Sequence, residues 1–381
     1  MTTPEAVVIG AGPAGVATGL ALKDAGVTPL IVDAADTIAS TWRGRYDRLR
    51  LNTCRPFSHL PDRPFARGVP MFPSRDQLIE HVEHHAVAGG LEFQLRTRVA
   101  RIEREGGGWT LETAGEPIRS RQVVVATGYE AVPNLPGWAE AGAFGGWVLH
   151  SSEYRNAEPF AGKQVLVVGA GSSGMEIAHD LATHGAAKVW VSVRTPPNVI
   201  LREGRGGLPG DMIGVMLLHL PTRVGDALGR LGQRMDVGDL AEYGLPVPEE
   251  GIFSRLNRLG VAPTIVDGEA IDSIRSGSIE IVPAVKSVGS DSLELTDGRR
   301  LGPDVIMCAT GYRRNLGSLV GHLGILDERE RPSAVGEVPA APGLRFIGYV
   351  PRPGGLGYMS KQAKRAARAI ARELSARRPV G

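Results

Sequence analysis

The apolar positions of the chain follow one arrangement that occurs twice. The fully apolar run Ala6–Ile9 precedes three spaced glycines and a helical pattern over Ala14–Ala25. The same order of apolar run, glycines and helical pattern recurs from Val165–Val168 onward. Short strands without polar positions are typical of the buried centre of a parallel sheet. The pattern predicts an α/β fold with two Rossmann-like dinucleotide-binding domains.

The first glycine motif has the surroundings that a nucleotide site requires. Gly10 permits a tight turn, Gly12 lets the backbone approach a pyrophosphate, and Gly15 lets the helix pack on the strand. The N-terminus of the helix offers N–H groups and the positive end of its dipole to phosphates. The next apolar strand, Leu30–Val32, ends in Asp33, near the ~20 residues expected for a ribose-binding acid. Strand, helix and acid together predict a dinucleotide site.

The second glycine motif, over residues 169–174, differs from the first in its polar residues. Ser172 and Ser173 can add hydroxyl donors to a phosphate cradle. The matching second strand, Val189–Val193, ends in Arg194 where an acid would hold a bare ribose. A guanidinium there offers a charged fork to a 2′-phosphate, which favours NADPH over NADH. An ordinary surface arginine is the alternative.

Between the two motifs lies the segment Phe144–Tyr154, which reads F-x-G-x-x-x-H-x-x-x-Y. It resembles the identifying linker of the flavin-containing monooxygenases, which joins an FAD domain to an NADPH domain. A plain interdomain loop is the alternative, and the two flanking dinucleotide motifs argue against it. The resemblance implies that FAD and NADPH are the cofactors, with FAD at the N-terminal site. His150 is expected to be structural rather than a general base.

The likeness covers nearly the whole chain and narrows to the YUCCA flavin monooxygenases of plants. Similar stretches surround Tyr46–Leu49, Pro73–Ala86, Val167–Leu181, Thr264–Pro283 and Ala309–Asn315. It implies that the second dinucleotide-binding domain is inserted in the first. Residues 1–158 and 303–381 then form the FAD domain, and residues 159–302 form the NADP domain. An apolar insertion at about 205–260 either lines a substrate entrance or only completes the core of the domain.

The resemblance also implies a reaction. NADPH reduces FAD, and the reduced flavin reacts with O2 to give a C4a-hydroperoxide that delivers one oxygen atom to a small organic substrate. Asn52 falls where many family members place an asparagine near the C4a edge, so it is the candidate catalytic residue. A turn-forming asparagine is the alternative.

The substrate class depends on the same segment. The plant enzymes usually read L-H-L-P-K where this chain has Arg50-Leu-Asn52-Thr-Cys54. A neutral amide at this position favours oxidation of a soft nitrogen or sulfur centre. Two alternatives stay open. One is carbonyl oxidation of the YUCCA or Baeyer–Villiger kind, for example of an indolic 2-oxo acid. The other is a flavoprotein that binds FAD and NADPH for a redox role without oxygenating anything.

Residues at several further positions are expected to contact the cofactors. In flavoproteins of this type, the turns Ala126–Gly128 and Ala309–Gly311 mark the crossings between nucleotide domains. The full set is Gly10, Gly12, Pro13, Ala14, Gly15, Asp33, Thr41, Trp42, Val99, Ala126, Thr127, Gly128, Gly169, Gly171, Ser172, Ser173, Gly174, Arg194, Thr195, Ala309, Thr310, Gly311 and Gly348.

Composition limits the possible functions. Cys54 and Cys308 are the two cysteines and form no C-x-x-C pair, which excludes a disulfide framework and a dithiol reductase of the thioredoxin-reductase kind. A formal net charge of +2 provides no field that favours nucleic acid or membrane partners. The first strand starts at Ala6, which leaves no room for a signal peptide. The longest apolar run, near Met212–Leu220, is about half the ~20 residues of a membrane span. We expect a cytoplasmic protein, without stable membrane association, for which a homodimer is an open alternative.

Three short runs predict a β-meander in the first domain, and two helical patterns flank it. The runs are Phe93–Glu105, Trp109–Thr113 and Gln122–Val125. Ser360–Ser375 is expected to be the closing helix of the FAD domain. On the helix Gln77–Ala88, three histidines on neighbouring positions are expected to form a solvated face and not a metal site, because no H-E-x-x-H pattern accompanies them.

Overall fold

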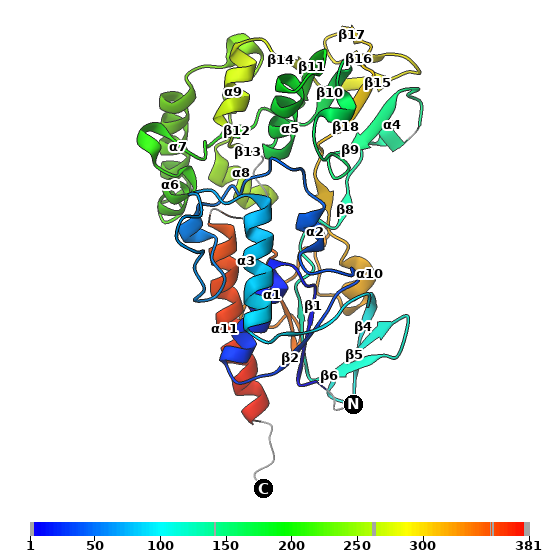
Figure 1. Cartoon of the computed structure of the whole chain (residues 1–381), viewed down its shortest axis with the longest axis vertical. Helices are drawn as coiled ribbons and strands as arrows, with labels where there is room; N and C mark the ends of the chain where they lie inside the picture. Colours follow the sequence, from blue (N-terminus) through cyan, green and yellow to red (C-terminus); the bar gives the residue numbers. More distant parts are fainter. Residues whose placement is uncertain (1–3, 141, 261–263, 351, 353, 377–381) are drawn as a thin grey trace. The chain divides into compact units, whose positions relative to one another are not determined.

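The computed structural model describes residues 4–140, 142–260, 264–350, 352 and 354–376 (Figure 1). The chain separates into two compact units. The first comprises the chain up to Arg43, Arg55–Val132, and the chain from Tyr312 onward. The second comprises Gly44–Cys54 and Pro133–Gly311. The fold is mixed α/β with parallel sheets, which confirms the predicted fold class.

The division differs from the expected domain boundaries in three segments, each for a physical reason. Residues 303–311 belong to the second unit because they contain β18 (Val305–Cys308), which pairs in parallel with β10 (Gln164–Val168). Residues 133–158 belong to the second unit because β9 (Trp147–His150) pairs in parallel with β18 (Val305–Cys308) of its sheet. Residues 44–54 belong to it because Tyr46, which is 4% exposed, lies in the core of that unit. The second unit therefore includes the linker and the candidate residue Asn52.

The first unit is built on a five-stranded sheet in which all the strands are parallel. In order across the sheet they are β20 (Leu344–Phe346), β7 (Gln122–Val125), β1 (Ala6–Ile9), β2 (Pro29–Val32) and β3 (Glu92–Gln94). All four residues of β1 are buried, as its apolar run predicts. Helix α1 (Pro13–Asp24) contacts β1, β2 and the long helix α11 (Gly355–Ala376), beside which it lies in Figure 1. Its buried residues run without a break from Pro13 to Leu22.

The expected meander is partly wrong. A three-stranded antiparallel sheet is present, made of β4 (Val99–Glu105), β5 (Gly108–Thr113) and β6 (Ile118–Ser120). Phe93 belongs instead to β3, and Gln122–Val125 is a central strand of the parallel sheet. All four residues of β7 are buried, because a strand covered on both faces needs consecutive apolar positions. The remaining short elements of this unit are α2 (Ser40–Arg43), η1 (Arg55–Phe57), α10 (Gly317–Val320) and η5 (Gly321–Leu323).

The solvated histidine face expected on α3 (Arg75–Ala88) is wrong for one of its members. His81 is only 7% exposed, and its ring stacks on Phe65 with the centroids 4.0 Å apart. His84, three residues further, is exposed. Burial, assisted by the neighbouring His85, lowers the pKa of His81 to about 4. The folded chain therefore holds this ring neutral at pH values where an unfolded chain protonates it.

His81 predicts a loss of stability in mild acid. Its pKa lies near 6.5 unfolded and about 4 folded, so its contribution is complete above pH 6.5 and is lost as the pH falls toward 4. We expect the free energy of unfolding to fall by about 2 kcal/mol less between pH 7.5 and pH 4.5 in His81→Phe than in wild type, allowing for partial solvation of the ring. Urea unfolding at both pH values measures this difference, with His84→Gln as the exposed control. An unchanged pH dependence in His81→Phe would contradict it.

The second unit repeats the plan of the first. In order across its parallel sheet lie β14 (Ile279–Pro283), β11 (Lys188–Val193), β10 (Gln164–Val168), β18 and β9. A second antiparallel sheet consists of β15 (Val285–Val288), β16 (Leu293–Leu295) and β17 (Arg300–Leu301). Helices α5 (Ser172–Thr183) and α9 (Gly268–Arg275) contact one another and β14. Both units thus combine a five-stranded parallel sheet with a three-stranded antiparallel one.

The insertion at about 205–260 is mainly helical. It contains η3 (Arg205–Gly207), α6 (Gly210–Leu217), α7 (Thr222–Val237), η4 (Ala241–Tyr243) and α8 (Ile252–Leu259). Val237, Leu240 and Leu245 join the core cluster of the second unit, so the segment does complete that core. The remaining short elements of the unit are α4 (Gly137–Glu140), η2 (Glu158–Phe160), β12 (Asn198–Val199) and β13 (Thr264–Ile265).

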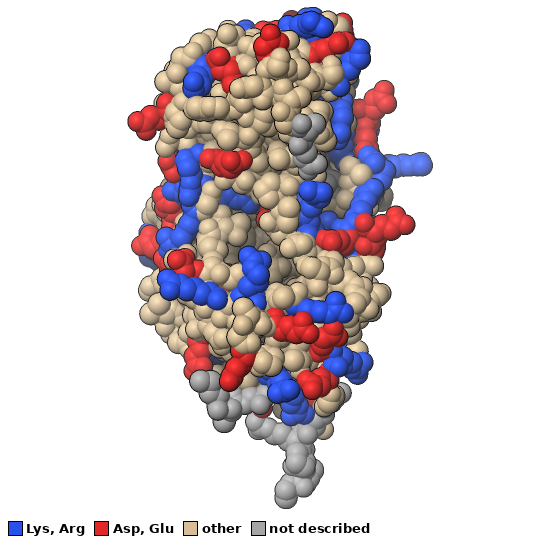
Figure 2. Space-filling model, turned by 90° about the vertical axis from the view of Figure 1, so that its right-hand side faces the viewer, with Lys and Arg blue, Asp and Glu red and all other residues tan. Residues whose placement is uncertain are grey.

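Charge is distributed without a large region of one sign on the face that Figure 2 shows. Basic and acidic side chains alternate across that face, in keeping with the net charge of +2. Among the helices that the structure describes, none is long and apolar enough to cross a membrane.

Candidate functional site

The glycine loop of the first unit has the geometry that its spacing predicts. Gly10 has a φ of +110°, and a Cβ there would lie 2.6 Å from the carbonyl oxygen of Ala126. A Cβ on Gly15 would lie 1.7 Å from the carbonyl oxygen of Gly10, because the helix packs directly on the turn. Gly12 differs from both, since a Cβ there would meet nothing within 4 Å. The loop is closed by Gly10 and Gly15 and leaves open space beside Gly12.

The start of α1 is available to an anion. Its N-cap is Gly12, and among the described residues no side chain accepts a hydrogen bond from the first turn. By contrast, α3 carries its own cap, in which Ser74 Oγ accepts from the N–H of Gln77 at 3.2 Å. The orphan N–H groups of α1 and the space beside Gly12 fit a pyrophosphate, which is the group that FAD would place there.

Asp33 lies where the spacing predicts and has a second role that the spacing does not reveal. Its Oδ2 accepts from the N–H of Ala11 at 2.6 Å, and its Oδ1 accepts from the N–H of Ala35 at 2.8 Å. The carboxylate therefore stabilises the glycine loop through its bond to Ala11. Each carboxylate oxygen can accept a further hydrogen bond, so a ribose hydroxyl remains compatible with this arrangement.

Thr41 and Trp42 lie next to the same loop. They belong to α2, and the residue before that helix, Ala39, donates its N–H to the carbonyl oxygen of Ala11 at 3.0 Å. Thr41 is exposed and Trp42 is half-buried. Val99 is separate from this group, since it opens β4 and packs against the core cluster of the unit.

Two later segments of the chain complete this end of the first sheet. Gly348 has a φ of +86°, and a Cβ there would lie 3.1 Å from the Cβ of Ala14 in α1. The hydroxyl groups of Thr127 and Tyr349 lie 2.7 Å apart. Gly128 ends the turn with a φ of +79°. The structure thus gathers residues near positions 10, 126 and 348 at the carboxyl end of β1, the part of a doubly wound sheet that binds ligands.

The glycine loop of the second unit has almost the same geometry. Gly169 has a φ of +113°, and a Cβ there would lie 2.5 Å from the carbonyl oxygen of Ala309. A Cβ on Gly174 would lie 2.0 Å from the carbonyl oxygen of Gly169. Gly171 caps α5 without a side-chain hydrogen bond. In both units, therefore, the first glycine of the loop packs against the alanine that opens a later Ala-Thr-Gly turn, Ala126–Gly128 or Ala309–Gly311. The N-terminus of the helix is then free to bind phosphate.

The two serines of this loop face protein partners. Ser172 Oγ donates to the carbonyl oxygen of Thr264 at 2.8 Å. Ser173 forms a hydrogen bond with the Tyr46 hydroxyl. The backbone N–H groups of α5, rather than these hydroxyl groups, are the open donors at this site.

Arg194 and Thr195 follow the end of β11 and are both exposed. The N–H of Gly169 donates to the carbonyl oxygen of Ser192 at 3.0 Å, so Arg194 lies two residues beyond the point where this strand meets the glycine loop. Within the described part of the chain, Arg194 has no hydrogen-bonding or ion-pair partner. A free guanidinium at this position fits a 2′-phosphate.

Polar groups of the linker motif hold it to the turn Ala309–Gly311. His150 Nδ1 accepts from the N–H of Ser152 at 3.1 Å, so Nε2 carries the proton and donates to the carbonyl oxygen of Gly311 at 2.9 Å. Burial lowers the pKa of His150. Tyr154 is fully buried and donates to Asp180 at 2.6 Å. Both ring nitrogens of His150 are engaged, which is the geometry of a structural residue.

Asn52 is exposed and is held by one arginine. Arg202 Nη2 donates to Asn52 Oδ1 at 2.9 Å and to the carbonyl oxygen of Arg50 at 3.2 Å, and its Nε donates to Leu51 at 3.2 Å. The same guanidinium pairs with Glu176 of α5. Three successive residues are thus held by one side chain, and the amide N–H₂ of Asn52 makes no hydrogen bond to the described residues. Arg202 and Glu176 are functional candidates that the sequence reasoning missed.

Glu176 is the buried anchor of this arrangement. It is 2% exposed, and it accepts from the Tyr46 hydroxyl at 2.8 Å as well as from Arg202. Burial raises the pKa of Glu176, while the charge of Arg202 and the hydrogen bonds from Arg202 and Tyr46 act to lower it. The carboxyl group lies one turn into α5, the helix whose N-terminus is the second candidate phosphate site. It therefore connects that helix, through Arg202, to Asn52.

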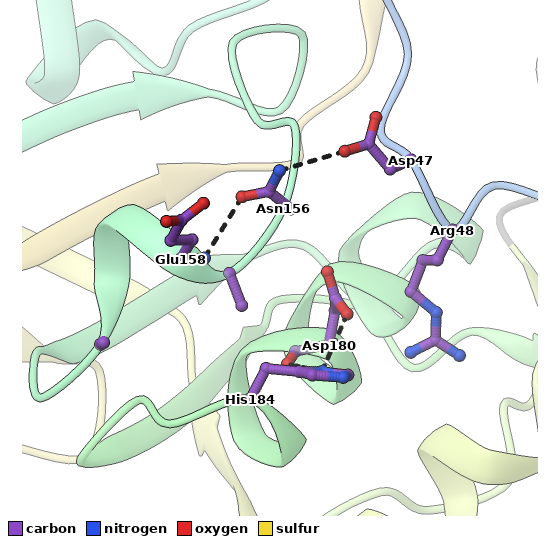
Figure 3. Close-up of a pocket in the computed structure, with 8 residues that line it drawn as sticks. Asp47, Arg48, Asn156, Glu158, Asp180 and His184 are labelled. Atoms are coloured by element: carbon purple, nitrogen blue, oxygen red, sulfur yellow. Dashed lines mark hydrogen bonds and ion pairs between the residues drawn. The ribbon is translucent and has the colours of Figure 1, made fainter.

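A separate hollow of ≈ 440 Å³ lies at the other end of α5 (Figure 3). Asn156 Nδ2 donates to Asp47 at 3.0 Å, and Asp180 lies 3.1 Å from His184. Arg48, at its rim, pairs with Glu269 at 2.7 Å. Because none of the predicted cofactor residues lines this hollow, it is not the candidate site.

Comparison with known proteins decides the family. A family model described as pyridine nucleotide-disulphide oxidoreductase matches residues 7–199. Indole-3-pyruvate monooxygenase YUCCA1 of Oryza sativa subsp. japonica is 38% identical over 336 residues, which is 87% of this chain and 82% of the relative. The probable indole-3-pyruvate monooxygenase YUCCA7 of Arabidopsis thaliana is 35% identical over 96% of this chain and 87% of its own. This chain belongs to the YUCCA family of flavin monooxygenases.

Solved structures agree with the fold of this flavin monooxygenase. A flavin-containing monooxygenase from Stenotrophomonas maltophilia superposes with a TM-score of 0.73 at 20% identity, over 98% of this chain and 100% of that one. A cyclohexanone monooxygenase superposes with a TM-score of 0.74 at 18% identity, over 98% and 88% of the two chains. Both structures share the predicted plan of two dinucleotide-binding domains.

Family membership fixes the class of reaction. The protein is a flavin-dependent monooxygenase, an oxidoreductase that uses FAD and NADPH and acts with O2 on a small molecule. The disulphide reduction named in the broader family description has no counterpart in its cysteines. Cys54 and Cys308 are both buried, and burial raises the pKa of the Cys308 thiol to about 12. A thiol in this state is a poor nucleophile.

Proposed function

We propose that the enzyme transfers one oxygen atom from O2 to a soft nitrogen or sulfur centre of a small organic substrate. When bound, NADPH supplies the hydride, and the reduced FAD supplies the reaction with O2. The glycine loop at Gly10–Gly15 holds FAD with Asp33, and the loop at Gly169–Gly174 holds NADPH with Arg194. In this proposal Asn52 donates a hydrogen bond beside the reacting oxygen.

The observation that carries the substrate class is the orientation of Asn52. Its carbonyl oxygen accepts from Arg202 at 2.9 Å, which turns the amide so that both of its N–H groups are available to donate to a bound molecule. Transfer to an amine or a sulfide needs a donor at the reacting oxygen and no base. Attack on a carbonyl carbon needs that oxygen to lose its proton, which a neutral amide does not promote.

A second candidate function rests on the relatives. Proteins 38% identical to this chain are indole-3-pyruvate monooxygenases, which favours a 2-oxo acid as the alternative substrate. The departure at residues 50–54 from the plant L-H-L-P-K pattern argues against it.

We also propose a cytoplasmic location, where NADPH is available and where cysteines that form no disulfide persist.

One experiment separates these functions. The purified yellow protein should consume O2 with NADPH, and mass spectrometry of products from amines, sulfides and 2-oxo acids should show one added oxygen in the first two classes. Efficient decarboxylation of an indolic 2-oxo acid would instead establish the carbonyl reaction. NADPH oxidation without an oxygenated product from any class would oppose both.

Arg194 predicts the choice of coenzyme. Replacing it with alanine removes a charge-assisted hydrogen bond worth ~1.5–3 kcal/mol, so NADPH should bind roughly 10- to 150-fold more weakly while NADH is hardly affected. Titration of both coenzymes by fluorescence measures the two dissociation constants. Arg300→Ala, at an exposed arginine of β17 in the same unit, is the matched control. Equal weakening of both coenzymes would show that Arg194 does not bind the 2′-phosphate.

A further inference from the structure

Exposed apolar side chains are concentrated in one segment of the second unit. Of the thirteen large hydrophobic residues more than a third exposed in the described chain, nine lie between residues 208 and 235. They are Leu208, Met212, Ile213, Met216, Leu220, Val224, Leu228, Leu231 and Met235. Most belong to α6 and α7, which contact one another (Figure 1). Monomeric proteins rarely expose so many apolar side chains together without an interaction partner.

Helix α7 exposes these apolar residues because buried contacts on its other side fix its orientation. Asp226, 4% exposed, accepts from the N–H of Phe253 at 2.8 Å. Gln233, 7% exposed, accepts from the N–H of Val199 at 3.0 Å. A Cβ on Gly225 would lie 3.0 Å from the Phe253 ring. These contacts fix the rotation of the helix about its own axis.

The fixed rotation leaves an apolar stripe outside. Val224, Leu228, Leu231 and Met235 follow one another at spacings of four, three and four residues, so they lie along one face of α7. Their exposed fractions are 47%, 43%, 55% and 55%. The helix therefore buries two polar side chains, Asp226 and Gln233, while four apolar side chains lie in solvent, which is the reverse of the usual amphipathic arrangement.

The charges beside the stripe are mainly basic. Of the two acids of α7, Asp226 is buried and Asp236, at the end of the helix, is half-buried. The arginines of α7 are Arg223, Arg230 and Arg234, and none of them pairs with an acid in the described chain. An apolar face bordered mainly by free guanidinium groups is complementary to a surface with anionic headgroups over hydrocarbon.

We propose that the α6–α7 face docks reversibly on an anionic lipid surface. The apolar stripe of α7 and Met212, Ile213 and Met216 of α6 enter the boundary between headgroups and acyl chains, and the arginines bind the headgroup phosphates. A second copy of the chain fits this face less well. Two antiparallel α7 helices packed through the stripe would bring their arginine-bearing flanks together, and like charges repel. The contact is peripheral and is independent of the substrate proposed above.

Vesicle flotation tests the proposal on the purified, flavin-loaded full chain. Vesicles of phosphatidylcholine are compared with vesicles in which about a third of the lipid is phosphatidylglycerol. We expect at least tenfold stronger binding to the anionic vesicles, and weaker binding at high salt. The double variant Leu228→Gln/Leu231→Gln should lose binding at least tenfold, and Arg223→Gln/Arg230→Gln/Arg234→Gln should lose the preference for anionic lipid.

Two matched controls separate this face from general effects. Val87→Gln alters a side chain that is 79% exposed on α3 and should not change binding. Lys361→Gln/Arg365→Gln/Arg368→Gln removes three exposed charges from α11 and should leave the lipid preference intact. Equal binding to both kinds of vesicle, or binding by the Leu228/Leu231 variant as strong as wild type, would overturn the proposal. So would a concentration-dependent dimer in analytical ultracentrifugation that the Leu228/Leu231 variant abolishes, because a second copy would then cover the face.

Discussion

Replacing Gly12 with valine is expected to give a folded chain that no longer retains FAD. The backbone conformation of Gly12, with a φ of −77°, is one that any residue can adopt. A Cβ there would meet no atom of the described residues within 4 Å. The protein itself therefore tolerates the side chain. The bound cofactor does not, because the branched side chain fills the space through which the backbone approaches the pyrophosphate. We expect flavin content to fall at least tenfold.

The measurement is the ratio of flavin to protein absorbance after gel filtration, with circular dichroism to establish folding. Gly115→Val is the matched control, because Gly115 lies in an exposed turn of the same unit and its Cβ would meet only Thr113 Oγ1 at 3.9 Å. Gly15→Ala should behave differently from both. Its Cβ would lie 1.7 Å from the Gly10 carbonyl oxygen, so folding and flavin should be lost together. Gly12→Val with full flavin and normal turnover would refute the FAD assignment of this loop.

The parts of the fold that the sequence predicted are those encoded by adjacent residues. β1 occupies the predicted range Ala6–Ile9, because four consecutive apolar residues before a glycine turn leave few alternatives. α1 and α5 begin at the predicted turns for the same reason. The closing helix was also recognised, although α11 begins at Gly355, five residues before the predicted start. Local pattern determines where such elements begin and which type they are.

The parts that the sequence did not reveal depend on residues far apart in the chain. The bond from the N–H of Ala11 to Asp33 and that from Ser172 to the carbonyl oxygen of Thr264 join segments whose approach is set by sheet order. The placement of β7 in the parallel sheet, rather than in the meander, is also a matter of pairing. Strand order is decided by tertiary packing, which periodicity along the chain does not report.

The buried face of α7 is another feature that the spacing of apolar residues does not predict. Apolar residues at helical spacing normally mark the buried face of a helix, so the stripe on α7 reads as core. The structure buries Asp226 and Gln233 instead, because each satisfies a backbone N–H that would otherwise be unpaired. Arg202 was missed for a related reason. Its importance lies in the acceptors at residues 50–52 that it joins, about 150 positions earlier in the chain.

Asn52→Ala is expected to convert the enzyme from an oxygenase into an NADPH oxidase that releases H2O2. Loss of one pre-positioned hydrogen-bond donor to a reacting oxygen typically costs about 10²–10³-fold in rate. The ratio of oxygenated product to H2O2 should fall by about that factor. The rate of NADPH oxidation should change much less, because hydride transfer does not need this contact. H2O2 and product are assayed in parallel, with stopped-flow absorbance to time the reoxidation of the flavin.

Arg202 should act on the same step through Asn52, as a positioning residue. Arg202→Gln frees the Asn52 amide from its 2.9 Å bond and should lower the product ratio at least tenfold, with Arg202→Lys restoring part of it. The double variant Asn52→Ala/Arg202→Gln should have the same product ratio as Asn52→Ala alone, because both changes remove the same interaction. Arg48→Gln is the matched control, since Arg48 pairs with Glu269 in the same unit and does not touch Asn52. Additive losses in the double variant would mean that Arg202 acts independently of Asn52. Unchanged coupling in Asn52→Ala would remove Asn52 from the reaction, whatever Arg202 does.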